Sequence, residues 1–473
     1  MKTITRRSFN KLILTGLAAR GSVSLADSLE TGSDISPAAY PLRQPIADEL
    51  IRTGLEKAII KTLLPAASQQ AYPGHFTATR TGEPWPREVT WPGLDAWEST
   101  GAYLLLGHEQ IALDSFDFIQ ASQRADGNIP WAILSADSKP EGIDGVFNGA
   151  RYPQDVYCYK PAPRKGQPAG SNMAERKWLA VFKHWQPKVN PLGVLAPVSY
   201  ILTGWEIFEH CQSKSWLLEK INSLTSAGRY VLSRESTNGL IAGAAFYIEL
   251  PPRNQWDGVT QCYAVHVFRL LAKMHSFLGG NDEAEAWLKE ADKLTGNFRR
   301  IFWMGDHFAE YVHPDQGVVD FHGLTDVNWA AIAFAVATDE QTKALWPLMM
   351  KEKELWHGDM PTQLVSKPYA YRDWELNEPL SFELPLGPLY DVAASGRVWY
   401  LETLACLAMG ETERLKESVR KVCRMGQRYD WSWFDRYQPL QIWDVQVGTA
   451  RNYCEYPSIL VRTILGNPEL FVK

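Results

Sequence analysis

Apolar residues recur at helical spacing along most of the chain from about residue 47 onward. In the segment 108–123, for example, the apolar side chains that follow this period are Ile111, Phe116, Phe118 and Ile119. A repeat of this kind places the apolar residues on one face of a helix. The alternation of β-branched and polar residues that marks strands is scarce. The pattern therefore predicts an all-α protein.

The predicted helices come in pairs joined by short turns. The pairs are 95–106 with 108–123, 194–210 with 215–232, 260–278 with 282–303, 326–337 with 340–350, and 397–409 with 411–425, and a last helix covers 452–465. Gly279 and Gly280 separate the third pair and should end its first helix. Short and long connections alternate, which indicates a toroid of helical hairpins with its long loops on one face. An open helical solenoid is the alternative, but no fixed sequence period supports it.

The first 26 residues differ from the rest. They contain Thr5-Arg6-Arg7-Ser8-Phe9-Asn10-Lys11, then a weakly apolar stretch that ends in Ser24-Leu25-Ala26. This order resembles a twin-arginine export signal with cleavage after Ala26, although an ordinary secretory signal is also possible. Either signal predicts a periplasmic or secreted protein. No later stretch is apolar for long enough to span a bilayer.

Charge and cysteine content narrow the classes of partner. The 473 residues carry a formal net charge of −6, and the export segment holds five basic residues and no acid, so the remainder is more acidic still. This balance argues against nucleic acid or an anionic membrane as a partner. The six cysteines lie far apart, without zinc-type spacing, so we expect buried free thiols, no metal site and no cofactor.

Aromatic content points to a ligand with flat apolar faces. The chain has 19 Trp and 19 Tyr, more than core packing usually needs, and such amphipathic rings favour a carbohydrate. For any single Trp, packing in a helical core is the competing interpretation.

One stretch combines an aromatic ring with an acid just before a predicted helix. It reads Asn254-Gln255-Trp256-Asp257-Gly258-Val259-Thr260. The apolar face of a sugar can rest on the indole of Trp256 while Asp257 reaches the glycosidic oxygen, so Asp257 is the general-acid candidate. Glu249 is a second carboxylate in the same proline-stiffened loop. A simple helix cap is the other interpretation of Asp257.

Three further loops carry acids among aromatic residues. Asp95 follows Trp91 at a predicted helix start, where capping is an equally good explanation. Asp126 lies in an Asp-Gly turn, which turn chemistry alone also explains. Asp435 stands in the segment 429–439 beside Arg436, and Asp444 follows soon after. One acid here and one near Trp256 would supply the paired carboxylates of glycoside hydrolysis.

These motifs and their order resemble the six-hairpin glycosidase superfamily, and are similar to glycoside hydrolase family 63 and to α-L-rhamnosidases. The segments that carry the resemblance are Trp91-Pro92-Gly93-Leu94-Asp95, Gln123-Arg124-Ala125-Asp126-Gly127-Asn128-Ile129-Pro130, Gln255-Trp256-Asp257-Gly258-Val259, Ser395-Gly396-Arg397-Val398-Trp399 and Phe434-Asp435-Arg436-Tyr437-Gln438-Pro439. The resemblance implies an (α/α)6 barrel. It also implies an acid at Asp257 and a base at Asp435.

The resemblance further implies that Trp91 and Asp95 line the sugar subsite. The other predicted substrate contacts are Asp126, Glu249, Trp256 and Trp399. The chain departs from the family in four places. The family's Glu-Ser pair before the acid is absent, and its Arg-Gly-Pro-Ile-Trp helix start is echoed only loosely at 395–399. Gly258-Val259 replaces an Asn-Ser pair after the acid, and Asp435 stands where the family has Glu, one methylene longer. For this reason Asp444, Glu375 and Glu383 remain rival bases.

Together these features predict a single (α/α)6-barrel catalytic domain over residues 27–473, secreted and acting on an oligo- or polysaccharide. In the expected inverting mechanism, Asp257 protonates the leaving oxygen while Asp435 deprotonates a water molecule. A polysaccharide lyase on the same toroid is one alternative, with His266, His313 or His322 as the base. A non-catalytic carbohydrate-binding protein is the other.

Overall fold

The computed structural model describes most of the chain beyond the predicted export signal. The described residues are 46–67, 78–79, 89–93, 96–135, 155–159, 177–183, 193–243, 253, 255–356, 362–367, 372–375, 394–439, 445–447 and 450–472. The predicted export signal at 1–26 lies outside them, as do four predicted or rival site residues: Asp95, Glu249, Glu383 and Asp444.

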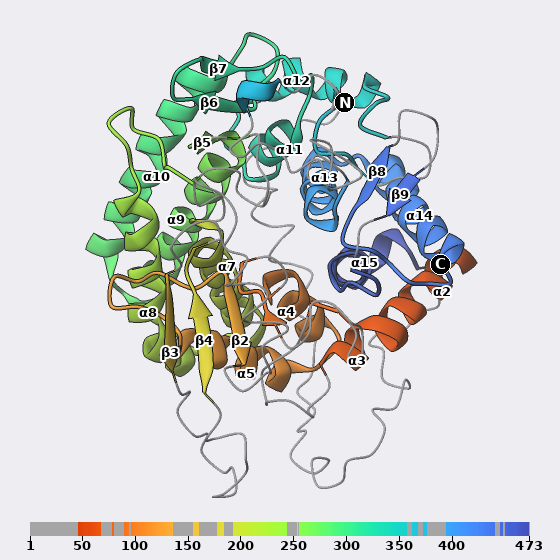
Figure 1. The fold of residues 1–473 in the computed structure, drawn as a ribbon, viewed down its shortest axis with the longest axis horizontal. Coiled ribbons are helices and arrows are strands. Elements are labelled where there is room, and N and C mark those ends of the chain that lie inside the picture. The colour runs from red at the N-terminus through yellow and green to blue at the C-terminus, as the bar shows by residue number, and fades with distance from the viewer. Residues whose placement is uncertain are drawn as a thin grey trace, which may run out of the picture.

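Six helices form a closed inner ring around the barrel axis (Figure 1). In chain order they are α4 (Ala96–Leu105), α7 (Leu195–Cys211), α9 (Gly258–Leu278), α11 (Asp326–Ala333), α13 (Gly396–Met409) and α15 (Glu455–Gly466). Each packs against the next, and α15 packs against α4, which closes the ring. The predicted toroid is therefore confirmed as an (α/α)6 barrel.

An outer layer of helices covers this ring (Figure 1). It consists of α2 (Glu49–Lys57), continued by the π-helical turn η1 (Ala58–Leu63) and α3 (Leu64–Ala66), then α5 (Glu109–Gln120), α8 (Lys214–Ser233), α10 (Asn281–Phe302), α12 (Asp339–Lys351) and α14 (Thr412–Arg428). The helices from α5 to α14 each pack against the inner helix that precedes them, and α2 packs against α15, so the two ends of the chain complete the sixth hairpin.

The two layers differ in sequence because they differ in surroundings. Inner helices touch neighbours on all sides, and nearly every residue of α15 and α11 is buried. The outer helix α14 instead carries a stripe of buried residues, including Leu415, Val419 and Val422, on an otherwise charged helix. A stripe at this spacing is what a helix with one covered face requires. The helix pairs predicted from periodicity correspond to these layers.

A buried arginine links four inner helices. Arg462 of α15 donates to the hydroxyl of Tyr400 in α13, to the carboxylate of Glu206 in α7 and to the backbone carbonyl of Trp97 in α4. The Trp97 indole also donates to Glu206 at 2.6 Å. These bonds satisfy buried polar groups that would otherwise destabilise the ring.

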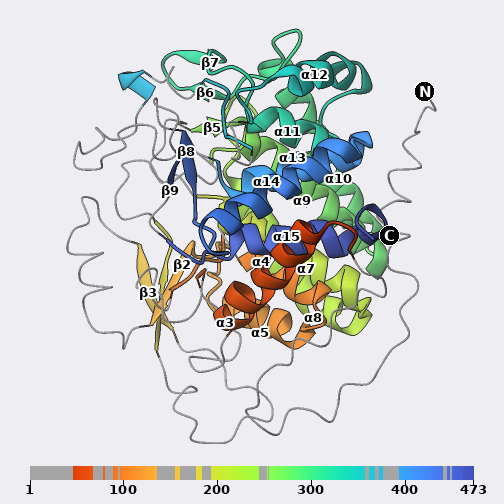
Figure 2. The same ribbon diagram turned by 90° about the vertical axis from the view of Figure 1, so that its right-hand side faces the viewer.

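Three small antiparallel sheets lie together at one end of the barrel, on the left in Figure 2. They are β1 (Val89–Thr90), β2 (Ala132–Ser135), β4 (Trp178–Val181) and β3 (Val156–Tyr159) in that spatial order, then β5 (Trp256–Asp257) with β6 (Tyr311–His313) and β7 (Gly317–Val319), and finally β8 (Tyr437–Pro439) with β9 (Val445–Val447). The sequence pattern did not predict these short strands. Because β1, β4, β5, β7 and β9 precede inner helices, the N-terminal ends of those helices lie at this strand-bearing end.

The helix ends follow local chemistry. Gly279 ends α9 in a left-handed conformation with φ of 88°, as expected. Helix α11 ends at Ala333, earlier than predicted, and Ala335 just beyond it has φ of 50°. Two short 3-10 turns, η3 (Asp373–Glu375) and η5 (Pro468–Leu470), complete the described elements. None of the helices in the described part of the chain is long and apolar enough to cross a membrane.

Candidate active site

Asp257 lies at the junction of β5 and α9. It is fully buried and caps α9, since its Oδ1 accepts the backbone N–H of Val259 at 2.7 Å. The next residue must be small, because a Cβ on Gly258 would lie 2.7 Å from Val327 of α11 and 3.0 Å from the carbonyl oxygen of Glu310. Capping is therefore one function of Asp257, as the sequence allowed. The close approach of Gly258 also brings the carboxylate of Asp257 to the start of α11.

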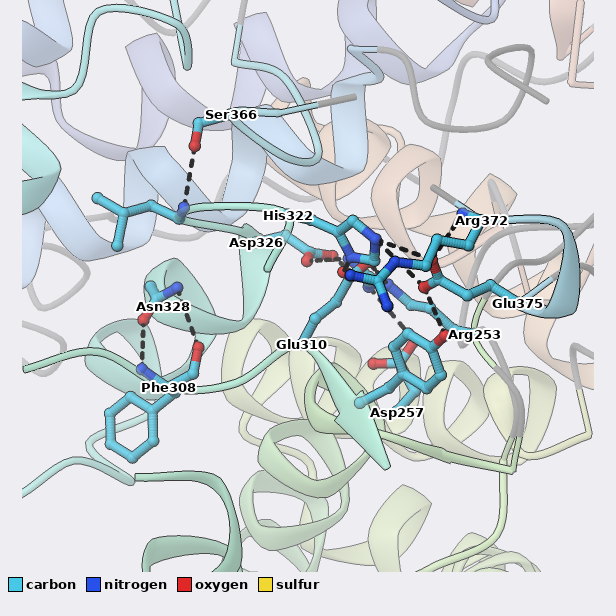
Figure 3. Close-up of polar contacts among 12 residues, drawn as sticks. Arg253, Asp257, Phe308, Glu310, His322, Asp326, Asn328, Ser366, Arg372 and Glu375 are labelled. Carbon is cyan, nitrogen blue, oxygen red and sulfur yellow. Dashed lines mark hydrogen bonds and ion pairs between the residues drawn. The ribbon is translucent and has the colours of Figure 1, made fainter. Parts of the chain in front are cut away.

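Arg253 joins Asp257 to two further carboxylates (Figure 3). Its Nη1 donates to Asp257 Oδ2 at 3.3 Å and to Asp326 Oδ2 at 3.1 Å, and its Nη2 donates to Asp326 Oδ1 at 2.7 Å. Its Nε donates to Glu310 Oε1 at 2.6 Å. All four side chains have no exposed surface, so these ion pairs act at low dielectric.

His322 continues this network on the far side of Glu310 (Figure 3). Its Nδ1 pairs with Glu310 Oε2, and its Nε2 lies 3.2 Å from Glu375. The hydroxyl of Tyr311 donates to Glu375 at 2.6 Å, as does the backbone N–H of Arg372 at 2.8 Å. Burial alone would lower the pKa of His322, but its two carboxylate partners outweigh burial and raise the pKa to about 9. His322 is therefore an imidazolium at neutral pH.

We call the residues Arg253, Asp257, Glu310, His322, Asp326 and Glu375 the arginine cluster. Its members come from four segments far apart in the sequence, and β5 and β6 hold two of those segments in register, with Asp257 opposite Tyr311. Of these residues, the sequence predicts Asp257 as the acid, Glu375 as a rival base and His322 as a base in the lyase alternative. Arg253, Glu310 and Asp326 were not predicted. Of these three residues, only Asp326 has a local sequence signal, because it lies in the first turn of a predicted helix.

A second group of charges lies between α13, α15 and β8. Asp435 accepts the backbone N–H of Ala450 at 3.1 Å and the Nε–H of Arg436 at 2.9 Å. Glu455, the first residue of α15, is fully buried and binds the guanidinium of Arg397. Burial raises the pKa of Glu455, against the opposing effect of Arg397, and the nearby charge of Asp435 raises it further. The charge of Asp435 thus acts on Glu455, a carboxylate that was not predicted from the sequence.

The described aromatic candidates occupy different surroundings. Trp256 is partly exposed and donates its indole N–H to Ser236 at 3.0 Å. Trp91 is buried at 5% exposure against Trp131, with ring centroids 4.7 Å apart. Trp399 is fully buried and donates to Ser418 of α14 at 3.0 Å. Its ring packs between α13 and α14. Trp399 therefore has the core-packing role that competes with a sugar contact for any Trp.

Asp126 is exposed and serves the turn in which it lies. Its Oδ1 accepts the backbone N–H of Asn128 at 3.0 Å, while Gln123 donates to the carbonyls of Gly127 and Ser223. The observed role of this segment is to fasten the end of α5 to α8.

The other two histidines proposed as lyase bases lie outside the arginine cluster. His266 of α9 stacks on Phe334, and burial lowers its pKa to about 3. His313 accepts the backbone N–H groups of Asp315 and Gln316 on its Nδ1, at 3.1 and 3.2 Å. Both rings therefore have structural roles in packing or in a turn.

Comparison with known proteins finds similarity in the fold. A GH78-family rhamnosidase of Bacillus sp. GL1 superposes with a TM-score of 0.55 at 13% identity, over 90% of this chain and 35% of that one. A rhamnosidase from Klebsiella oxytoca with rhamnose bound gives 0.56 at 9% identity, over 92% of this chain and 66% of that one. A GH63 mannosylglycerate hydrolase from Thermus thermophilus, in complex with glucose, gives 0.53 at 10% identity, over 85% of this chain and 98% of that one.

These neighbours have the helical-toroid fold of the six-hairpin glycosidase superfamily, and the present chain shares that fold. It spans about a third of the length of the Bacillus rhamnosidase and 66% of the Klebsiella enzyme. No protein-family model matches the sequence, and no curated protein sequence matches it significantly. The likeness is thus one of architecture rather than of sequence.

Proposed function

We propose that the protein is a glycoside hydrolase that inverts the anomeric centre of an oligo- or polysaccharide. The observation that carries the proposal is that β5, which holds Asp257, and β8, which follows Asp435, lie at the strand-bearing end of a barrel whose fold is shared with glycosidases (Figure 2). Each of these two acids belongs to a separate group of charged residues. Acid and base must come from different sides of the sugar ring in such a reaction.

Asp257 is proposed as the general acid. Its Oδ1 is committed to Val259, while its Oδ2 receives from Arg253 the longest of that residue's hydrogen bonds within the cluster, 3.3 Å against 2.6 to 3.1 Å. Oδ2 is therefore the oxygen from which a proton would pass to the leaving group. Trp256 next to it, with part of its indole exposed, is the proposed support for the sugar face.

Asp435 is proposed as the general base. Two donors, Ala450 N–H and Arg436 Nε–H, hold one oxygen each and fix the orientation of the carboxylate. Glu455, which binds Arg397 close to Asp435, is the alternative base, since the family that the sequence resembles has the longer Glu side chain in this role.

Geometry favours a partner for Asp257 outside the arginine cluster. Asp257 and Asp326 accept from the same nitrogen of Arg253, at 3.3 and 3.1 Å. Their oxygens are therefore closer together than the roughly 6.5 to 9.5 Å that leaves room for the attacking water in an inverting enzyme. Asp435 and Glu455 do not share a guanidinium nitrogen with Asp257, so this short separation does not apply to a base at either residue.

The lyase alternative is less well supported. A lyase base must accept a proton at working pH, but His322 already carries one, because its pKa is raised to about 9 by Glu310 and Glu375 in spite of burial. His266 packs within α9 against Phe334. We therefore favour hydrolysis over elimination.

The proposed location is the periplasm or the exterior of the cell. The support is the twin-arginine-type segment around Arg6 and Arg7. Fusing residues 1–26 to a reporter protein and locating that reporter after fractionation tests this part by itself, with Arg6→Lys, Arg7→Lys as the control. A reporter that stays in the cytoplasm would overturn it.

A panel of p-nitrophenyl glycosides and natural disaccharides tests the activity. Because the similar structures are named for rhamnose and mannosylglycerate chemistry, α-L-rhamnosides and mannosylglycerate belong in the panel. Proton NMR during the first minutes should show a product anomer opposite to that of the substrate. A retained anomer, or a product absorbing through a new C=C bond, would overturn the mechanism. Binding of a sugar without any turnover would favour a non-catalytic binding protein.

A further inference from the structure

We propose that His322 and Arg253 are positioning residues that control proton delivery by Asp257, through one continuous buried chain of ion pairs that ends at Glu375. The inference rests on the proposed function and adds to it two cationic residues that act through Asp257. Both residues would set the position and the protonation state of the Asp257 carboxylate.

Glu310 is the centre of this chain. One of its oxygens accepts from Arg253 Nε at 2.6 Å, and the other pairs with His322 Nδ1. Glu310 itself lies beside β7, where its backbone N–H donates to the carbonyl of Val319 at 3.0 Å. The position of Glu310 is thus fixed by the backbone, and it fixes both cations in turn.

His322 determines how strongly Arg253 is drawn toward Glu310. With the imidazolium in place, the negative charge of Glu310 is shared between two cations, and Arg253 keeps its bonds to Asp257 and Asp326. Without that charge, the cluster becomes more negative by one unit, while the bond from Arg253 to Glu310 remains. An added negative charge near a carboxylic acid favours its protonated form.

The surroundings of His322 come from several elements. Glu310 faces it from the loop before β6, and Glu375 faces it from η3. Tyr311 of β6 donates to Glu375, and Phe321 packs edge-on against the imidazole with the Arg372 guanidinium on its face. Two carboxylates in direct contact explain why the pKa of His322 rises to about 9 despite the lowering effect of burial.

The test compares His322→Gln with the wild type in the pH dependence of kcat/KM on an aryl glycoside that the wild type hydrolyses. The basic limb, where the general acid loses its proton, should move to higher pH by about half to one unit, less than the one to three units produced by a directly contacting charge. His307→Gln is the matched control, because His307 also pairs with a carboxylate, Asp306 at 2.7 Å, but on the surface. Its profile should match that of the wild type.

A second variant separates charge from folding. His322→Lys keeps a cation beside Glu310, so its basic limb should stay within a few tenths of a unit of the wild-type position. If His322→Gln does not fold, judged by circular dichroism, His322→Asn takes its place as the variant that removes the charge. A limb that shifts upward in His322→Lys as far as expected for Gln would overturn the proposal.

NMR titration of the histidine side chains gives a readout that needs no substrate. His322 should remain protonated through pH 8 in the wild type. Turnover by the wild type with an unmoved limb in His322→Gln overturns the positioning role alone. If the wild type hydrolyses no glycoside, the proposed function and this role fall together, while the NMR titration still tests the ion pair.

Discussion

Arg253 donates its Nε–H to Glu310 across 2.6 Å, and neither side chain has any contact with solvent. The same guanidinium binds Asp257 and Asp326, so one cation is shared among three buried carboxylates. Removing one partner of a buried ion pair leaves uncompensated charge and usually costs about 3 to 5 kcal/mol. The stability of the fold and the geometry of the candidate acid therefore depend on the same side chain.

Replacing Arg253 with Met should lower the free energy of unfolding by about 3 to 5 kcal/mol at pH 8. The loss should be smaller at pH 5, because carboxyl groups that bind protons no longer need the cation. Urea unfolding at both pH values measures the difference. Arg52→Met is the control, since Arg52 pairs with Glu49 at 3.6 Å on the exposed face of α2. A loss at Arg253 as small as at Arg52 would contradict the buried ion pairs.

Glu209 of α7 provides a pH-dependent test away from the candidate site. Burial, and next the charge of Glu206, raise the pKa of Glu209 to about 7. A carboxyl group with a raised pKa destabilises the folded state as pH rises from about 4.5 to 7, because the protein must ionise a buried acid. Glu209→Gln should therefore stabilise the protein at pH 8, by up to about 2 kcal/mol after allowing for partial exposure, and change little at pH 4.5.

Glu206 is the matched control for this prediction. It lies one turn earlier in α7, but it is held by Arg462 and by the indole N–H of Trp97. Glu206→Gln removes the ion pair and should destabilise the protein at pH 8. Thermal unfolding of both variants at pH 4.5 and pH 8 should give shifts of opposite sign at the higher pH. Shifts of the same sign would show that burial does not govern Glu209.

The helical architecture could be predicted from the sequence because short-range patterns of residues determine each helix. The stripe of Leu415, Val419 and Val422 shows where α14 meets the ring, and Gly279 shows where α9 ends. The short strands were missed because two- or three-residue strands such as Trp256–Asp257 have no period to detect. The pairing of this strand depends on Tyr311 and Val312, which lie more than fifty positions away.

The candidate site was predictable only in part for a related reason. Asp257 stands beside a Trp and a Gly at a helix start, which is a local signal. Glu310 and Arg253 have no such signal, since their roles exist only once β5 and β6 pair and bring them together. At Asp126, turn chemistry is a better explanation than ligand binding, because the carboxylate accepts the backbone N–H of Asn128.

Gly127 should tolerate no side chain. Its φ is 91°, and a Cβ there would lie 2.0 Å from the carbonyl oxygen of Ser226 in α8. Gly107 has a similar φ of 81° with nothing within 4 Å of the corresponding position. Both Gly→Ala variants incur backbone strain of about 1 to 2 kcal/mol, but Gly127→Ala should lose a further 1 to 3 kcal/mol or so through the steric clash. Equal losses in urea unfolding would show that the end of α5 does not depend on this close approach.

Asp257→Asn separates the two roles of this residue. Asn is a good helix cap and can still accept the Val259 N–H, so α9 should remain formed. It cannot donate a carboxylic acid proton, so kcat on a glycoside with a poor leaving group should fall by about 10²- to 10⁴-fold. A 2,4-dinitrophenyl glycoside needs little protonation of its leaving group and should lose far less.

The comparison of the two leaving groups is the decisive measurement for Asp257. Circular dichroism and the urea midpoint establish that the Asn variant is folded. Equal losses on both substrates would mean that Asp257 supports the site without donating a proton. Full activity on both would move the acid elsewhere, with Glu249 of the same loop as the next residue to replace. A loss confined to the poor leaving group would identify Asp257 as the acid, because only proton donation depends on the basicity of the departing oxygen.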